Sequence, residues 1–198
     1  MLKKIIFVVG MIVNGGAFAQ AENFTGASLA FNTGLNSTEI KLTNFPPYHS
    51  NSTPFVFNTS YTFALSPKAT LAVGFDYDLT DTVLISSADS GDSDWLLKDH
   101  YSINIEPGYA FNENTLGYIK LAYHNARSYY KPADVIADNN NISGVGYGFG
   151  AKIFFNKDLF LNLEIQQTEY GGYANSYFSG YNIVHTITTS TIGIGYKF

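Results

Sequence analysis

Side chains alternate between apolar and polar with a period of two residues along most of this chain. This period places successive side chains on opposite faces of a β-strand. Between residues 183 and 198, aliphatic and aromatic residues share one face, while histidine, threonine, glycine and lysine share the other. Eight segments follow the pattern: 24–33, 55–65, 69–79, 100–111, 115–127, 144–155, 159–170 and 183–198. The chain is therefore expected to form a sheet whose two faces meet different surroundings.

The connections between these segments alternate in length. Short connections lie at 66–68, 112–114 and 156–158, and long ones at 34–54, 80–99, 128–143 and 171–182. Most segments have roughly the 9 to 11 residues that a tilted strand needs to cross a bilayer. Short turns alternating with long loops are typical of outer-membrane barrels. The sequence thus predicts an all-β fold, an eight-stranded antiparallel transmembrane β-barrel with short periplasmic turns, long extracellular loops and both termini in the periplasm.

The face on which each residue type lies predicts which side meets lipid. Bulky residues occupy odd positions in the second, third and fourth segments, and small or polar residues occupy even positions. Three-residue turns keep this parity from one strand to the next. The embedded charges of the third to seventh segments are all even and therefore predicted to point inward: Asp76, Asp78, Glu106, Lys120, Lys152 and Glu164. Lysine on the lipid face would cost about 2 to 4 kcal/mol at the midplane. Outward aromatic residues near strand ends are expected to form interfacial girdles.

The N-terminus reads as a secretory signal. Lys3 and Lys4 precede a short apolar run and small residues, which predicts a signal peptide over residues 1–19, with cleavage after Ala19 or, alternatively, after Ala21. Residues 20–198 then form one barrel domain. Removing two of the 11 basic residues and none of the 16 acidic ones leaves a charge of 9 − 16 = −7, which argues against a nucleic-acid partner. The chain has no cysteine, so no disulfide framework is expected.

Several short motifs resemble one known family. Residues 106–109 (Glu-Pro-Gly-Tyr), the run 116–123, the glycine-rich run 146–152 and the terminal Tyr-Lys-Phe at 196–198 are similar to the small OmpA-like, opacity-type outer-membrane β-barrels. The resemblance implies a monomeric eight-stranded barrel of the porin-family surface proteins in a Gram-negative outer membrane. It does not imply one activity, because such relatives include adhesins, serum-resistance proteins and surface antigens.

Turn register predicts ion pairs inside the barrel. Glu106 is expected directly across from Lys120, Lys152 diagonally next to Glu164, and Asp76 at a similar height. Because eight strands enclose a lumen just wide enough for side chains to fill, the favoured interpretation is a plug of mutually neutralising groups. The alternative is a gate that opens a narrow pore.

The long connections and the histidines provide the remaining candidates. Aromatic residues among asparagine, serine and glycine suit recognition surfaces. The loop candidates are Tyr48, Tyr129, Tyr130, Tyr173, Tyr177, Phe178 and Tyr181. His100, His124 and His185 are predicted to line the outer mouth, without a metal role being favoured, and residues 89–94 suit a solvated acidic loop better than a calcium site.

These observations predict a non-enzymatic surface protein. It would support the envelope, contact lipopolysaccharide, and present four loops for adhesion or recognition of host or cell-surface molecules, with no cofactor and no metal. A narrow small-solute pore is the alternative, and a lipid-modifying enzyme and a soluble lipocalin-like carrier are less favoured. A lipid-modifying enzyme would need a nucleophile beside a base at the lipid edge, whereas the inward histidines are expected to point away from it, and no motif of such enzymes is recognisable.

Overall fold

The structure, a computed structural model, describes residues 20–42, 46–86, 94–130, 138–173 and 183–198. A short 3-10 helix, Ala21–Phe24, precedes the strands β1 (Gly26–Leu42), β2 (Tyr48–Ser52), β3 (Phe55–Ala64), β4 (Ala69–Asp78), β5 (Thr82–Ile85), β6 (Trp95–Ala110), β7 (Thr115–Tyr130), β8 (Asp138–Phe154), β9 (Leu159–Tyr173) and β10 (Ile183–Lys197). Among the described residues, no helix is long and apolar enough to span a membrane.

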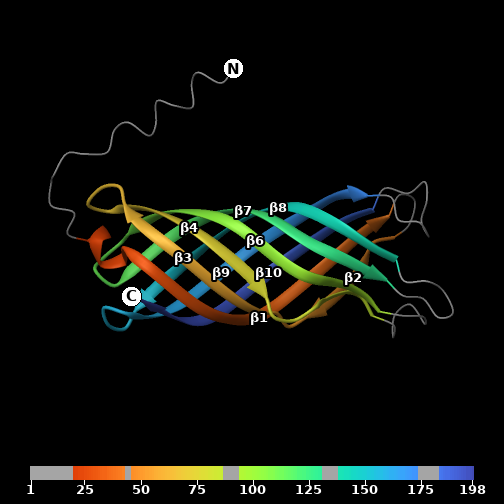
Figure 1. The fold of residues 1–198 in the computed structure, drawn as a ribbon, viewed down its shortest axis with the longest axis horizontal. Helices are drawn as coiled ribbons and strands as arrows, with labels where there is room; N and C mark the ends of the chain where they lie inside the picture. The colour runs from red at the N-terminus through yellow and green to blue at the C-terminus, as the bar shows by residue number, and fades with distance from the viewer. Residues whose placement is uncertain (1–19, 43–45, 87–93, 131–137, 174–182) are drawn as a thin grey trace, which may run out of the picture.

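Eight of these strands form a closed antiparallel barrel (Figure 1). The order around the wall is β1, β3, β4, β6, β7, β8, β9 and β10, and β10 pairs again with β1. This closing pair runs from Ser28 opposite Lys197 to Leu42 opposite Ile183. Closure leaves these eight strands without a free edge along their shared ladders. The predicted eight-stranded antiparallel barrel is confirmed.

Three tight turns lie together at one end of the barrel, here called the turn end (Figure 1). Each is closed by a backbone hydrogen bond, in which Leu65, Phe111 and Phe155 donate to the carbonyls four residues ahead at 2.8 to 2.9 Å. These bonds confirm the three-residue turns, and with them that odd positions face the same side on both strands of each hairpin. The short helix lies at the same end, where the Ala21 amide donates to the Pro67 carbonyl at 3.0 Å.

The strands run further toward the opposite end, the loop end, than the sequence predicted. The prediction of unpaired loops at 34–54, 80–99, 128–143 and 171–182 was wrong for much of these stretches. β1 continues to Leu42, β6 begins at Trp95, β7 ends at Tyr130 and β9 at Tyr173. Two short strands complete the wall there, β2 beside β1 and β5 beside β6.

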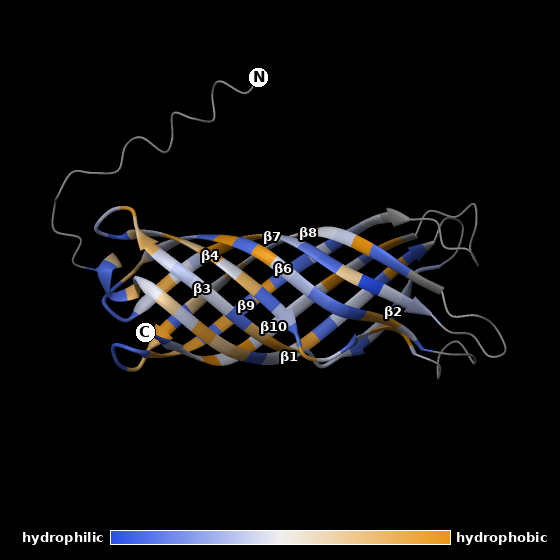
Figure 2. Ribbon diagram, in the orientation of Figure 1, coloured by the Kyte–Doolittle hydropathy of each residue, from blue (hydrophilic) through white to orange (hydrophobic). Residues whose placement is uncertain are grey.

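The outward face changes character between the two ends of the barrel. Figure 2 shows the hydropathy of each residue along the strands. Over the turn-end part of the wall the outward face is apolar, and exposed residues such as Phe31, Val73, Ile105 and Ile194 form a continuous band. All eleven aromatic residues predicted to point outward in girdles are exposed: Tyr61, Phe63, Tyr77, Tyr101, Tyr109, Phe111, Tyr123, Tyr147, Phe149, Tyr196 and Phe198. The outward direction of these side chains is thus confirmed.

Toward the loop end the outward face is mostly polar. This portion, here called the β-extension, comprises residues 36–42, 48–52, 82–85, 95–98, 125–130, 138–143, 167–173 and 183–190. Its outward residues include Glu39, Lys41, Asn51, Lys98, Arg127, Asn141, Ser143, Glu169, Thr188 and Ser190. The sequence rule assumed an apolar outer face, so it read these polar-faced strands as loops. A wall that is polar outside suits water rather than lipid.

A bulge in β6 adjusts the interior at the start of the β-extension. The pairing of β6 with β7 shifts between Lys98 and Tyr101, and Asp99 lies between them with a φ of 49°. One extra residue reverses the parity of a strand beyond the bulge. Leu97 therefore points inward although it is odd, while Ser102 points inward from an even position.

Candidate functional site

The lumen is filled in three layers, apolar at both ends and polar between them. The turn-end cluster consists of Phe24, Ala30, Ala110, Leu116, Phe154 and Phe160. The loop-end cluster consists of Ile40, Leu84, Trp95, Leu97, Ala126, Ile142, Tyr170 and Ile187. Phe24, from the short helix, packs edge-on against Phe154 with ring centroids 5.2 Å apart. The short helix thus helps to close the turn end.

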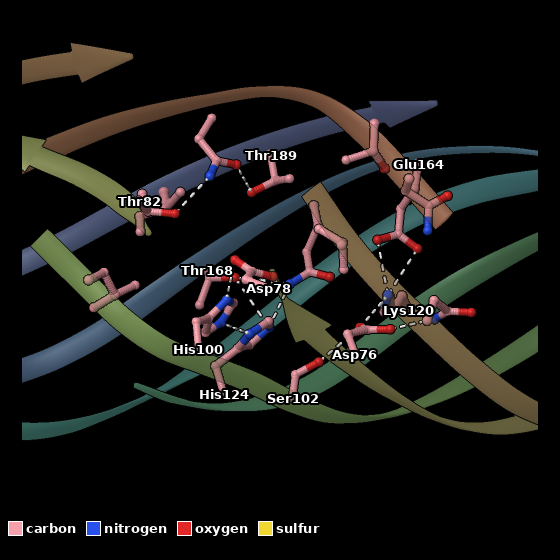
Figure 3. Close-up of a pocket in the computed structure, with 18 of the residues that line it drawn as sticks. Asp76, Asp78, Thr82, His100, Ser102, Lys120, His124, Glu164, Thr168 and Thr189 are labelled. Atoms are coloured by element: carbon pink, nitrogen blue, oxygen red, sulfur yellow. Dashed lines mark hydrogen bonds and ion pairs between the residues drawn. The ribbon is translucent and has the colours of Figure 1, made fainter. Parts of the chain in front are cut away.

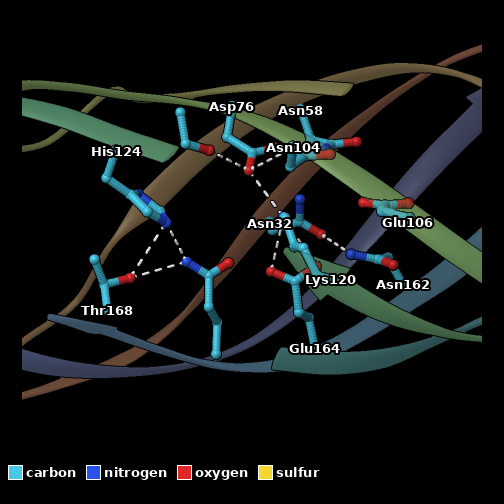
Figure 4. Close-up of polar contacts among 12 residues, drawn as sticks. Asn32, Asn58, Asp76, Asn104, Glu106, Lys120, His124, Asn162, Glu164 and Thr168 are labelled. Atoms are coloured by element: carbon cyan, nitrogen blue, oxygen red, sulfur yellow. Dashed lines mark hydrogen bonds and ion pairs between the residues drawn. The ribbon is translucent and has the colours of Figure 1, made fainter. Parts of the chain in front are cut away.

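Lys120 on β7 is the centre of the polar layer (Figure 4). Its ammonium nitrogen lies 2.8 Å from Asp76 Oδ2 on β4 and 3.0 Å from Glu164 Oε1 on β9. Asp76 also accepts hydrogen bonds from Ser102 at 2.9 Å, from Asn104 at 3.0 Å and from Asn58. With these donors the buried carboxylate is satisfied on both oxygens, as a group removed from water requires.

A second ion pair lies closer to the turn end. Lys152 Nζ on β8 lies 2.8 Å from Glu106 Oε2 on β6, and both side chains are buried. Tyr118 joins the two ion-paired groups, because its hydroxyl donates to Glu164 Oε2 at 2.8 Å while Lys152 Nζ lies 5.1 Å from its ring centroid. The five predicted residues therefore form one connected network inside the barrel.

The predicted partners within this network were wrong. Glu106 pairs with Lys152 and not with the directly opposite Lys120, and Glu164 pairs with Lys120 and not with Lys152. The register itself is as predicted, since Gly150 lies opposite Glu164. In a narrow closed barrel, however, inward side chains converge toward the axis. Each lysine therefore reaches past its neighbouring strand to a carboxylate farther around the wall.

The histidines lie where the polar layer meets the loop-end cluster (Figure 3). His100 Nδ1 is 2.7 Å from Asp78 Oδ2, and His100 Nε2 is 2.8 Å from His124 Nδ1. A cavity of about 50 Å³ adjoins these groups. It has room for roughly three water molecules. His185 lies apart from this pair and packs edge-on against Trp95, with ring centroids 5.2 Å apart.

The described residues contain no group of three or more histidine, aspartate or glutamate side chains placed to hold a metal ion. The acidic loop residues 89–93 lie outside the described residues, so the calcium alternative stays a prediction. The same holds for Tyr177, Phe178 and Tyr181 and for the side chain of Tyr173.

Three loop candidates are described, and they differ in exposure. Tyr48 begins β2 and is 42% exposed. Tyr129 and Tyr130 end β7 and are half-buried: Lys98 Nζ lies 4.6 Å from the Tyr129 ring centroid, and Tyr130 packs on Trp95. Tyr48 is thus the described aromatic candidate most available to a partner.

The sequence interpretation missed the apolar residues that close the loop end. Trp95 is fully buried, and its indole nitrogen donates to Ser128 Oγ at 2.7 Å. Trp95 and Leu97, two apolar residues at alternate positions before the charged Lys98, were a usable signal for a strand with an apolar inner face. They lay in a stretch read as a loop because the bulge at Asp99 breaks their phase with the rest of β6.

Comparison with known proteins identifies the fold family. The family model "outer membrane protein beta-barrel domain" matches residues 5–198. No match was found among curated proteins.

Solved structures of low sequence identity share the fold. Ail, the attachment invasion locus protein of Yersinia pestis, is 15% identical, with a TM-score of 0.53 over 88% of this chain and 99% of Ail. Ail in complex with the heparin analogue sucrose octasulfate gives 13% identity and a TM-score of 0.52 over 87% and 99%. Neisserial surface protein A gives 14% and 0.54 over 87% and 99%.

The closed barrel, its outward apolar band and the family match all indicate a membrane-spanning β-barrel. An apolar band around a closed barrel with a polar interior is the arrangement that a lipid bilayer selects. The localisation to the outer membrane follows from the family. The chain belongs to the outer membrane protein beta-barrel domain family.

Proposed function

We propose that this protein is a non-conducting, non-enzymatic surface barrel that raises a β-extension above the outer membrane for recognition. In this proposal the turn end and both termini face the periplasm, the protein is a monomer, and lipopolysaccharide surrounds the foot of the β-extension. The observation that carries the proposal is the inversion of wall polarity along the barrel axis, from apolar outside to polar outside.

The filled lumen supports the non-conducting part. An ion would have to pass two apolar clusters and a network in which both lysines are already paired. Removing ions from water into such surroundings is costly. The network is therefore interpreted as a plug, and the narrow pore is the alternative.

The β-extension supports the recognition part. A rigid strand scaffold can hold contact residues with little ordering cost on binding. Tyr48 is the first residue of β2, and its side chain is exposed at the loop end of the β-extension. A structural neighbour, the attachment invasion locus protein Ail, has been solved in complex with the heparin analogue sucrose octasulfate. Sulfated saccharides are therefore a reasonable first probe of binding.

Orientation can be tested by labelling, since the chain has no cysteine of its own. Asn51→Cys lies on the outward face of the β-extension, and Asn156→Cys lies in a turn at the other end. In intact cells, a membrane-impermeant maleimide should label Asn51→Cys alone, and both should react after lysis. Labelling of Asn156→Cys alone in intact cells would show that the turn end faces outward and would refute the proposed orientation.

Conduction can be tested with the purified, refolded protein in a planar bilayer at neutral pH. Folding is checked by heat-modifiable migration in gels. The wild type should be silent, and so should Glu106→Gln if its layer is a plug. Discrete openings of the wild type whose conductance changes in Glu106→Gln would refute the plug interpretation and favour the narrow pore.

Recognition can be tested on cells that display the barrel. Binding of a sulfated oligosaccharide and attachment to cultured cells should fall in Tyr48→Ser. Tyr123→Phe, in the outward apolar band, is the matched control and should leave both unchanged. Equal binding by cells with and without the barrel would refute the recognition role for this class of ligand.

A further inference from the structure

The paired histidines form a continuous chain of contacts across the barrel (Figure 3). Asp78 on β4 contacts His100 on β6, and His100 contacts His124 on β7 at the distances given above. His124 Nε2 in turn lies 2.5 Å from the side-chain amide nitrogen of Gln166 and 3.3 Å from Thr168 Oγ1, both on β9. The two imidazole rings are stacked, with centroids 5.0 Å apart and an interplanar angle of 12°.

Only one proton fits between the two rings. A neutral imidazole has one N–H and one acceptor nitrogen, and an imidazolium has two N–H groups. With both rings neutral, Gln166 donates to His124, His124 donates to His100, and His100 donates to Asp78. Every donor then has an acceptor, and the chain ends on a carboxylate.

One further proton can be placed on the pair, because Asp78 offsets a single positive charge. A second cannot. Two imidazolium rings would set N–H against N–H at 2.8 Å and hold two positive charges 5.0 Å apart. The contact between the rings would then be repulsive at short range.

The other groups facing the pair do not relieve this repulsion. Asp76 on β4 and Glu164 on β9 are both held by Lys120 on β7, which carries a positive charge of its own. Tyr170 on β9 packs edge-on to both imidazoles, with its ring centroid 6.2 Å from that of His100 and 6.3 Å from that of His124. Full protonation of the pair must therefore move the rings apart.

The pair is packed against the residues that close the loop end. Tyr170 contacts both rings and is itself a fully buried member of the loop-end cluster. Leu97, another member, lines the same cavity as His100 and His124 and lies on β6 just beyond the bulge at Asp99. A displacement of either imidazole ring therefore displaces Tyr170 and Leu97, the cluster members that lie next to it.

We propose that His100 and His124 form an acid-operated latch that keeps the loop-end cluster closed at neutral pH and releases it when both rings carry a proton. Release opens the outer half of the lumen to water. This goes beyond the proposed recognition function, since a barrel that binds no partner would still open in acid.

The protein contains its own reporter, because Trp95 is its single tryptophan and is fully buried in the loop-end cluster. The experiment measures acrylamide quenching of Trp95 fluorescence in the refolded protein in phospholipid nanodiscs, from pH 8 to about pH 2.5, because burial and the neighbouring His100 both oppose the second proton. The quenching constant of the wild type should rise at least threefold in acid and return on neutralisation. His124→Phe keeps a ring of similar shape without a titrating group, and its quenching should stay at the neutral value.

Two controls separate the latch from other acid effects. His185→Gln removes the histidine that touches Trp95, and His49→Gln removes the one on the outward face of β2; both should keep the wild-type response. A flat response of the folded wild type would overturn the proposal. So would a rise that persists in His124→Phe, since the carboxylates would then be responsible.

A measurement on the wild type alone covers the case in which His124→Phe does not fold. Side-chain ¹⁵N NMR of the histidines should show two rings becoming cationic over the same pH interval in which Trp95 becomes accessible. Exposure of Trp95 while either ring is still neutral would refute the latch.

Discussion

Removal of the Lys120 ammonium is the sharpest test of the lumen network. Lys120→Met keeps most of the side-chain volume and leaves Asp76 and Glu164 facing one another without their shared cation. The Lys120 side chain is 3% exposed, so water must enter the barrel before it can solvate the two unpaired carboxylates. The substitution should therefore destabilise the barrel strongly at neutral pH.

The magnitude follows from the geometry. Two carboxylates lie 2.8 and 3.0 Å from the ammonium nitrogen. At an effective dielectric constant of ~20, each such attraction is about 5 to 6 kcal/mol before the cost of burying the charges. Much of this is offset by desolvation, and breaking a buried pair by removing one partner costs about 3 to 5 kcal/mol net. We expect a loss in that range.

Urea unfolding of the protein in phospholipid vesicles gives the free energy of unfolding, with Trp95 fluorescence and heat-modifiable migration as two readouts. Lys98→Met is the matched control, because Lys98 pairs with Asp81 at 3.3 Å on the outside of the β-extension and its side chain is 29% exposed. Exposed pairs contribute about 0 to 1 kcal/mol.

A loss in Lys120→Met no larger than that in Lys98→Met would show that the central lumen is solvated, and the plug interpretation would fail. The triple variant Asp76→Asn, Lys120→Met, Glu164→Gln removes both stranded charges along with the cation. It should recover much of the stability lost in the single variant, because neutral amides in place of the carboxylates no longer repel one another.

Three further substitutions or measurements test other parts of the structure. Phe24→Ala should lower the free energy of unfolding by about 3 to 5 kcal/mol in the same assay, since it leaves a cavity where the Phe24 ring packs against Phe154 in the turn-end cluster. Gly34→Ala should abolish the folded, heat-modifiable form, because its Cβ would lie 1.9 Å from the Ser190 carbonyl oxygen where β1 pairs with β10. Gly171→Ala is the control and should fold normally, because its Cβ would have no atom within 4 Å. The mass of the exported protein should correspond to a chain that begins at Gln20, which keeps the buried Ala21 and its hydrogen bond to β-turn residue Pro67 in the fold.

The sequence alone determined most of the barrel in the apolar band. A two-residue period fixes which residues share a face, and three-residue turns carry that parity across each hairpin, so the inward charges and the outward aromatic residues could be assigned without coordinates. Asp76, Glu106, Lys120, Lys152 and Glu164 are all inside, as the parity of their positions required. These assignments need only local geometry.

The tertiary structure decided what depends on closure. The partner of each lysine follows from distances across the lumen, which the pairing of β10 with β1 sets and no single hairpin contains. The tertiary structure also decided where the strands end. Beyond the apolar band the two-residue period continues, but apolar side chains point inward and polar ones outward. The bulge at Asp99 also shifts the inward positions of β6 by one residue. Period alone cannot tell which face meets lipid and which meets water, because both give the same alternation. Only the closed barrel shows which side is the interior.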